Sequence, residues 1–277
     1  MRKLSVIGLA VLGLCVVAGI AYASNTYTST GKITPATAGT SARPAPVSAA
    51  LTFTVGETTG VRPSPLKTYG IGLGAGVVPH TSVAKGCTSS QANAQVLPAV
   101  CSRKASLGGA NVGGGSVKAF AGPTSNTSTK LDCFLTVTLV NSTRANHLWI
   151  RVDGVTTGPA GKTCVTAQHS SIDSTFVKTG TAPRKGGGSK LPVWAIRFTV
   201  PPALLHPIGG FDVAVINNVS NVSKVSKTTG SGRRKVTHGY LETIGCPAAP
   251  RGQREAVVTF TSEAGQTLTS KSRSACS

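Results

Sequence analysis

Apolar and polar residues alternate along much of the chain. The decapeptide LDCFLTVTLV places Cys133, Leu135, Val137 and Leu139 on one face, and LPVWAIRFTV, starting at Leu191, repeats the pattern. Successive side chains of an extended chain point to opposite faces, so this two-residue period is typical of strands with one buried face. The pattern therefore predicts β-strands rather than helices over these segments.

The same pattern predicts nine strands, separated by Gly, Pro and polar residues. They are Ala49–Val55, Lys67–Val78, Leu131–Val140, His147–Val152, Leu191–Val200, Phe211–Ile216, Lys235–Ile244, Ala256–Thr261 and Thr267–Arg273. Capped helical periodicity is absent from the sequence, apart from one short turn at Pro201–Leu205. We therefore expect an all-β protein with a single antiparallel, immunoglobulin-like β-sandwich over residues 49–277.

The first 23 residues have the pattern of an export signal. Two basic residues precede an uncharged, mostly apolar run, Leu4–Ile20, and the small-residue cleavage site Ala21-Tyr22-Ala23 follows. We predict a cleaved signal peptide over residues 1–23, and a protein that is secreted and retained in part at the cell envelope. The alternative is an uncleaved anchor, because the run of 17 residues reaches the short limit of a membrane span.

Residues 24–48 are rich in Thr, Ala and Pro and show no apolar period, which predicts a flexible leader before the folded domain. No second long apolar run follows, so we expect no transmembrane anchor after cleavage. Three Gly-rich segments, 108–116, 184–189 and 228–232, are predicted to be loops.

Six of the seven cysteines follow the export signal, and an even number in an exported chain predicts three disulfides. Six cysteines allow 15 pairings. We expect the sequential one, Cys87–Cys101, Cys133–Cys164 and Cys246–Cys276, because each bond closes a short loop between neighbouring strands. Free buried thiols are the alternative. Structural zinc usually needs cysteines two to four residues apart, and the spacing here does not offer that.

The charge balance is strongly basic, with 28 Lys and Arg against 8 Asp and Glu. The export signal holds two of the basic residues and no acid, so residues 24–277 carry a net charge of +18. Such an excess favours an anionic partner, for example a wall polymer, lipid headgroups or nucleic acid. Export and an aromatic content of 5% argue against nucleic acid. A basic surface that only keeps the protein soluble is the alternative.

Basic residues gather in the last part of the chain. The side chains expected to contact an anion are Lys224, Lys227, Arg233, Arg234, Lys235, Arg251 and Arg254, and Lys271 and Arg273 extend the group. Neighbouring strands would bring these charges to one face or edge of the sheet. Lysines on edge strands also prevent edge-to-edge aggregation, an explanation that needs no ligand.

Known catalytic and cofactor-binding patterns are missing from the sequence. GVTTGPAGKT ends like a phosphate-binding loop, but Thr156 stands where that motif needs glycine. His169, followed by Ser170, Ser171 and Asp173, is the most suggestive local group, yet catalytic triads rarely come from adjacent residues, so we predict a polar loop there. The histidines lack the usual metal-ligand spacing, and the eight acids are scattered singly. We therefore expect no catalytic residue, cofactor or metal.

Several features together resemble a group of uncharacterised secreted proteins of high-GC Gram-positive bacteria. They are the export signal, Pro-Ser-Pro-Leu-Lys from Pro63, the Cys87 and Cys101 pair, the strand WAIRFTVP, and GYLETIGCP before a terminal cysteine. The likeness is one of layout and covers roughly residues 49–276. It implies an exported β domain and no particular catalytic residue.

These observations lead to three functional hypotheses. The first is a non-enzymatic secreted or envelope-associated protein that contacts an anionic envelope polymer, or another surface protein, through charge and loops. The second is a secreted hydrolase of cell-wall or extracellular carbohydrate, which would require two carboxylates to converge. The third is a structural module of a surface assembly, which would show an apolar patch or an unpaired strand edge.

Overall fold

The computed structural model describes residues 24–37, 39–159, 163–232, 235–249 and 252–277. The predicted signal peptide, residues 1–23, lies outside them. The strands are β1 Asn25–Thr34, β2 Ala45–Glu57, β3 Leu66–Ala75, β4 Val77–Pro79, β5 Asn111–Pro123, β6 Leu131–Asn141, β7 His147–Gly154, β8 Gln168–Ala182, β9 Leu191–Thr199, β10 Phe211–Val222, β11 Ser226–Thr229, β12 Val236–Gly239, β13 Leu241–Thr243, β14 Gln253–Ser262 and β15 Thr267–Ala275. The short helices are α1 Ser89–Ala92, α2 Ala99–Ser102 and α3 Pro202–Leu205, with 3₁₀ turns at Thr81–Val83 and Ala105–Leu107.

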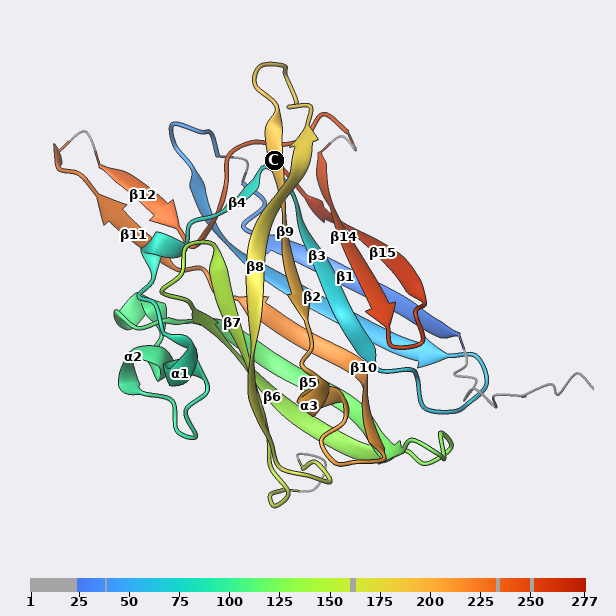
Figure 1. The fold of residues 1–277 in the computed structure, drawn as a ribbon. Coiled ribbons are helices and arrows are strands. Elements are labelled where there is room, and N and C mark those ends of the chain that lie inside the picture. The colour runs from blue at the N-terminus through green and yellow to red at the C-terminus, as the bar shows by residue number, and fades with distance from the viewer. Residues whose placement is uncertain (1–23, 38, 160–162, 233–234, 250–251) are drawn as a thin grey trace, which may run out of the picture.

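Thirteen strands form one antiparallel sheet in the order β15-β14-β3-β9-β8-β7-β6-β5-β10-β2-β13-β4, with β1 paired to β2 (Figure 1). The sheet folds back so that its halves face each other. The rings of Phe53 in β2 and Phe260 in β14 lie 5.1 Å apart, and Ser29 of β1 hydrogen-bonds Ser270 of β15 at 2.8 Å. The all-β, antiparallel prediction is confirmed. Because the strands form one continuous sheet rather than two, the immunoglobulin-like assignment stays a prediction.

The core lies between the facing halves of the sheet and forms where the alternating strands turn their apolar faces inward. Leu135 of β6, Ile172 of β8 and Val258 of β14 are among its buried members. A neighbouring cluster contains Val225 and Tyr240, which flank the β11–β12 hairpin. Burial of such side chains contributes about 1.5–3 kcal/mol each before the entropy of folding is subtracted.

The prediction that residues 24–48 form a flexible leader is wrong for the described part of this segment, most of which lies in strands. Instead, β1 pairs with β2 in register from Asn25↔Glu57 to Thr34↔Ser48. The buried positions of β1 are Asn25, Ser29 and Ile33, so two of the three are polar, and half-buried Tyr27 stacks on Phe260. Buried polar side chains in β1 have hydrogen-bond partners inside the fold. For example, Asn25 donates to the carbonyl of Ser64 at 2.9 Å. Because its buried positions are mostly polar, the alternation of apolar and polar residues does not reveal this strand.

The Gly-rich segment 108–116, predicted to be a loop, lies mostly in β5, between β10 and β6. Its glycines allow an unusually close approach of neighbouring strands. A Cβ at Gly115 would overlap the carbonyl oxygen of Val219, and one at Gly113 would overlap that of Asn221. Glycine is the residue that permits close approach of another backbone inside a strand.

All three predicted disulfides are confirmed: Cys87–Cys101, Cys133–Cys164 and Cys246–Cys276. The last one joins the segment after β13 to the residue after β15, so it fixes the C-terminal strands to the body of the sheet. Cys87–Cys101 closes the α1–α2 segment, and Cys133–Cys164 links β6 to the segment after its neighbour β7.

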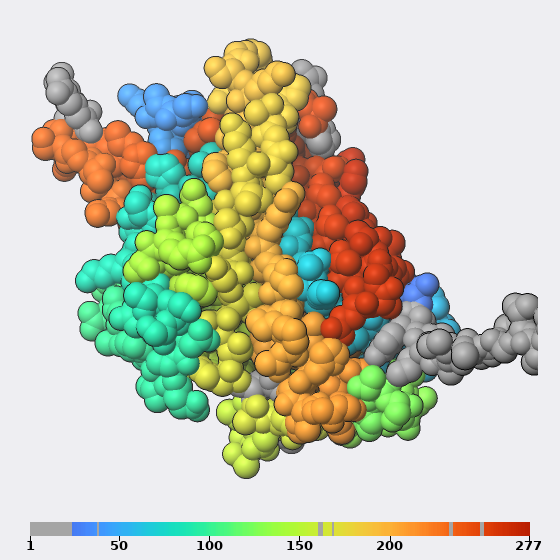
Figure 2. All heavy atoms as spheres, in the orientation of Figure 1, coloured from blue at the N-terminus to red at the C-terminus, as the bar shows by residue number. Residues whose placement is uncertain are grey.

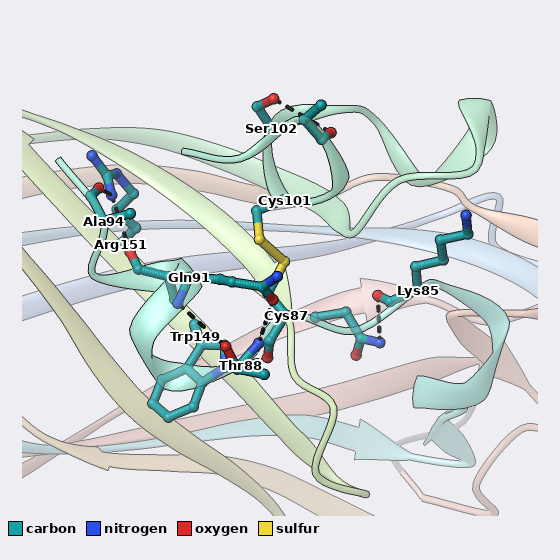
Figure 3. Close-up of a disulfide and its surroundings, with 12 residues drawn as sticks. Lys85, Cys87, Thr88, Gln91, Ala94, Cys101, Ser102, Trp149 and Arg151 are labelled. Carbon is teal, nitrogen blue, oxygen red and sulfur yellow. Dashed lines mark hydrogen bonds between the residues drawn. A yellow bond between two sulfur atoms is a disulfide. The ribbon is translucent and has the colours of Figure 1, made fainter. Parts of the chain in front are cut away.

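The segment with α1 and α2 packs on β7 and is fastened there (Figure 3). The Cys87–Cys101 bond closes it, and the indole N–H of Trp149 donates to the carbonyl of Cys87 at 3.0 Å. The buried guanidinium of Arg151 donates to the carbonyls of Ala92, Ala94 and Gln95. Among the described residues, no helix has the length and apolar character needed to cross a membrane.

Candidate functional site: the basic arm

Strands β11 and β12 form a two-stranded antiparallel sheet of their own, outside the main sheet. The register runs from Ser226↔Gly239 to Thr229↔Val236, with Lys227 opposite His238. We call residues 224–239 the basic arm. The hairpin projects from one end of the molecule, and Figure 2 shows it standing clear of the body at the upper left. Each of its β11 residues is exposed.

Two buried residues, Val225 and Tyr240, lie at the base of the arm. Val225 is 4% exposed, and Tyr240 is fully buried. The backbone N–H of Tyr240 donates to the carbonyl of Val225 at 2.8 Å, and its hydroxyl donates to the side-chain oxygen of Asn141 at 3.1 Å. Burial raises the pKa of the Tyr240 hydroxyl, so it stays neutral and remains a donor. The base of the arm is therefore fixed to the core while its strands face solvent.

Positive charge on the arm is not neutralised nearby. Five of the twelve residues from 224 to 235 are basic and none is acidic. Lys224, Lys227 and Lys235 are exposed, and within the part of the chain that the structure describes none of them pairs with a carboxylate. Arg233 and Arg234 lie outside the described residues.

The acids contact other side chains instead, and Glu242, the one that contacts a described arm residue, contacts His238 rather than a lysine. Each of the eight has a partner: Glu57 with Thr59, Asp132 with Lys118, Asp153 with Arg151 and His169, Asp173 with Arg144 and His147, Asp212 with Arg62 and His206, Glu242 with His80 and His238, Glu255 with Lys271 and Arg273, and Glu263 with His206. The excess lysines are left with solvent as their partner.

The other predicted anion contacts do not join the arm. Arg254 was expected at the surface, but it is 1% exposed and donates to backbone carbonyls, among them that of Gly245 at 3.3 Å. Burial lowers the pKa of its guanidinium to about 10, which leaves it charged at neutral pH. Alternation within β14 turns Arg254 inward, so its assignment as an anion contact is wrong. Arg251 lies outside the described residues.

The local group around His169 is not brought together, and it lies in β8 rather than in a loop. The Nδ1 atom of His169 contacts Asp153 at 2.8 Å, and Nε2 contacts the carbonyl of Asn93 at 2.8 Å. Asp173 instead contacts His147 and Arg144. These contacts tie neighbouring strands and the α1 segment together, and the ring nitrogens of His169 contact Asp153 and Asn93 rather than a serine.

A pair of histidines at the base of the arm was missed by the sequence analysis. His80, which follows β4, and His238 in β12 both contact the buried carboxylate of Glu242 in β13. The signal that could have found them is the i, i+4 spacing of His238 and Glu242, but His80 is distant in sequence and only strand pairing brings it close.

The core also contains an apolar cavity of about 180 Å³, lined by residues such as Leu73, Val117, Leu139, Ile150 and Phe198. Among the described residues that line it there is no carboxylate, histidine or cysteine. The cavity therefore offers no acid–base pair, and the charged arm is the better candidate for function.

The chain was compared with protein-family models, with curated proteins and with solved structures, and none of the three comparisons gave a match.

Proposed function

We propose that this protein is a non-enzymatic binding protein that contacts anionic polymers of the cell envelope through its basic arm. The proposal includes export through residues 1–23 and a location outside the cell, at the envelope. The observation that carries it is the projecting arm, whose lysines are exposed and, among the described residues, form no ion pair with a carboxylate.

The physical basis is long-range attraction rather than a shaped pocket. A cluster of unpaired charges on a projecting element attracts a polyanion, and each cation that contacts it releases a condensed counterion. Binding should therefore be strong at low salt and should weaken steeply as salt rises. The three disulfides support the proposed location, because such bonds persist in oxidising compartments.

The finer fold assignment belongs to the same proposal. Immunoglobulin-like sandwiches commonly bind through loops gathered at one end. The basic arm projects from one end of this all-β domain, which supports an immunoglobulin-like use of the fold: a rigid, disulfide-stabilised body that presents one binding element.

The test is co-sedimentation of the exported protein with purified cell envelopes of its host across a salt series. Lys227→Gln with Lys235→Gln removes two arm charges. Lys271→Gln with Arg273→Gln is the matched control, because it removes two exposed charges from β15, where both contact Glu255. We expect wild type and the control to be retained at low salt, and the arm variant to be released at lower salt. Equal retention of both variants, or no retention of wild type at low salt, would overturn the proposal.

A further inference from the structure

Three potential metal ligands meet at the base of the basic arm. Two of them are four residues apart in the sequence, and the third, His80, is distant from both. They are His80, His238 and Glu242, and one ligand atom from each lies within 4.8 Å of the others. The histidine nitrogens that contact the carboxylate are Nε2 of His80 and Nδ1 of His238. His80 directly follows β4, His238 lies in β12, and Glu242 lies in β13. Among the described residues, this is the only group of at least three such side chains in that geometry.

The backbone that carries these ligands is held in place. In the sheet, β13 pairs with β4 so that Glu242 lies opposite Val78. The backbone N–H of His80 donates to the carbonyl of Tyr240 at 2.8 Å. Asn141 reinforces this arrangement, because it donates to the carbonyl of Thr81 at 2.9 Å and accepts from the Tyr240 hydroxyl. The backbone around the three ligands is therefore held by hydrogen bonds, with two ligands on strands and His80 directly after one.

The distances suit a small transition-metal ion. One carboxylate oxygen of Glu242 lies 3.6 Å from His80 Nε2, and the other lies 3.3 Å from His238 Nδ1. Ligands at about 2.0–2.1 Å from a tetrahedral metal are roughly 3.3 Å apart. The two imidazole rings stack at 4.9 Å between centroids with 18° between their planes, so both side chains must rotate to point a nitrogen lone pair at one ion.

The carboxylate is buried and the two histidines are partly exposed, so a fourth ligand can approach from solvent. The Glu242 side chain is 5% exposed, whereas those of His80 and His238 are 38% and 33% exposed. The buried carboxylate also accepts the backbone N–H of Gly239 at 3.2 Å, which orients it. Two histidines, one carboxylate and an open, solvent-facing direction form a ligand set that binds Zn²⁺ with a water in the fourth position.

The other histidines differ. His147, His169 and His206 each contact an aspartate that an arginine also contacts, and among the described residues none of these aspartates contacts a second imidazole. An arginine beside the carboxylate competes with a cation for the same oxygens. At Glu242, the structure shows no such arginine or lysine among the described residues.

We propose that His80, His238 and Glu242 form a binding site for one divalent transition-metal ion, with Zn²⁺ the expected occupant. Imidazole ligands favour such ions over Mg²⁺ and Ca²⁺, which prefer oxygen ligands. The proposal goes beyond anion binding by the basic arm and does not depend on it.

The test uses the untagged exported protein, stripped with a chelator and titrated with ZnCl₂ in a calorimeter. Replacement of Zn²⁺ by Co²⁺ gives an independent visible absorption spectrum that reports the coordination geometry. We expect one ion per chain, no competition from excess Mg²⁺, and at least a ten-fold loss of affinity in His80→Ala and in His238→Ala.

The matched control is His169→Ala, which removes a partly buried histidine that contacts an aspartate outside the site. It should keep wild-type affinity. Both His80 and His238 are about one-third exposed, so their variants are expected to fold, and circular dichroism checks this. Absence of stoichiometric Zn²⁺ binding to the wild type, or wild-type affinity in the folded His80→Ala and His238→Ala variants, would overturn the proposal.

Discussion

The two most buried arginines show how far burial changes what a basic residue does. Arg62 and Asp212 form an ion pair at 3.4 Å in which both side chains are 0% exposed. Arg62 also donates to the carbonyls of Thr129 and Pro123. Arg254 is likewise buried and donates to backbone carbonyls, among them that of Gly245. Neither residue is available to a ligand, although each adds as much to the net charge of the sequence as an arm lysine does.

Removing one member of the buried pair should be costly. Arg62→Ala leaves the Asp212 carboxylate buried with fewer partners, and we expect a loss of about 3–5 kcal/mol in the free energy of unfolding. Lys118→Ala is the control, because its pair with Asp132 is solvent-exposed and should contribute about 1 kcal/mol or less. Urea denaturation of both variants measures the difference. Equal losses would contradict the structural role of Arg62.

His206 predicts a dependence of stability on pH. Partial burial alone would lower its pKa, but the hydrogen bond and charge of Glu263, and then those of Asp212, outweigh this, so the pKa of the imidazole is raised. A histidine whose pKa is higher in the folded state stabilises the fold fully below its unfolded pKa, about 6.5, and loses that contribution as pH rises through the folded pKa. Arg62 also contacts Asp212 and limits the effect.

The measurement is the difference in Tm between wild type and His206→Gln from pH 5.5 to pH 9. We expect the wild-type advantage to be largest at pH 5.5 and to shrink as pH rises. A difference that is constant or grows over this range would show that the charged imidazole does not stabilise the fold.

At the scale of elements, the sequence predicts strands well where one face is apolar. The alternating segments of β6, β7, β9 and β14 match the predicted strands closely. The alternating pattern is absent where polar residues occupy the inner face of a strand and form hydrogen bonds there. In β8, for example, buried Ser174 lies between Ile172 and Phe176 and donates to the carbonyl of Leu148. Polar residues that are hydrogen-bonded inside the fold do not register as an apolar pattern.

The glycines of β5 give an element-scale prediction. Gly115→Ala places a methyl group against the backbone of β10, so neighbouring strands must shift, and we expect a loss of about 1–3 kcal/mol in stability. Gly180→Ala, in β8, is the control, because a Cβ there meets nothing within 4 Å. Thermal unfolding of the two variants compares them. A Gly115→Ala protein as stable as Gly180→Ala would contradict the close approach of β5 and β10.

For the whole molecule, cysteine spacing is the best long-range information in the sequence. It predicts all three disulfides, whereas it says nothing of the pairing that brings His80 to His238. The lysine-rich segment is visible in the composition, but its projection from the fold is not, since that depends on buried Val225 and Tyr240 at its base. Both the meeting of His80 with His238 and the projection of the arm depend on tertiary strand pairing, which local sequence patterns do not reveal.

The Cys246–Cys276 bond anchors the C-terminal strands, so its removal tests the assembly of the sheet. Cys246→Ser with Cys276→Ser should reduce stability by about 2–4 kcal/mol, mainly by freeing the unfolded chain. Chemical denaturation of the double variant under non-reducing conditions measures this. No change in stability would indicate that β14 and β15 are held without the bond.

The central claim is that the basic arm binds polyanions. The most direct measurement is the equilibrium affinity of residues 24–277 for a defined polyphosphate as a function of salt, with Lys227→Gln and Lys235→Gln combined in one variant. We predict that the logarithm of affinity falls linearly with the logarithm of salt concentration. The variant should lose about one unit of slope for each lysine that contacts the polymer. An unchanged slope in this variant would contradict the claim, as would an equal decrease in the Lys271→Gln and Arg273→Gln control.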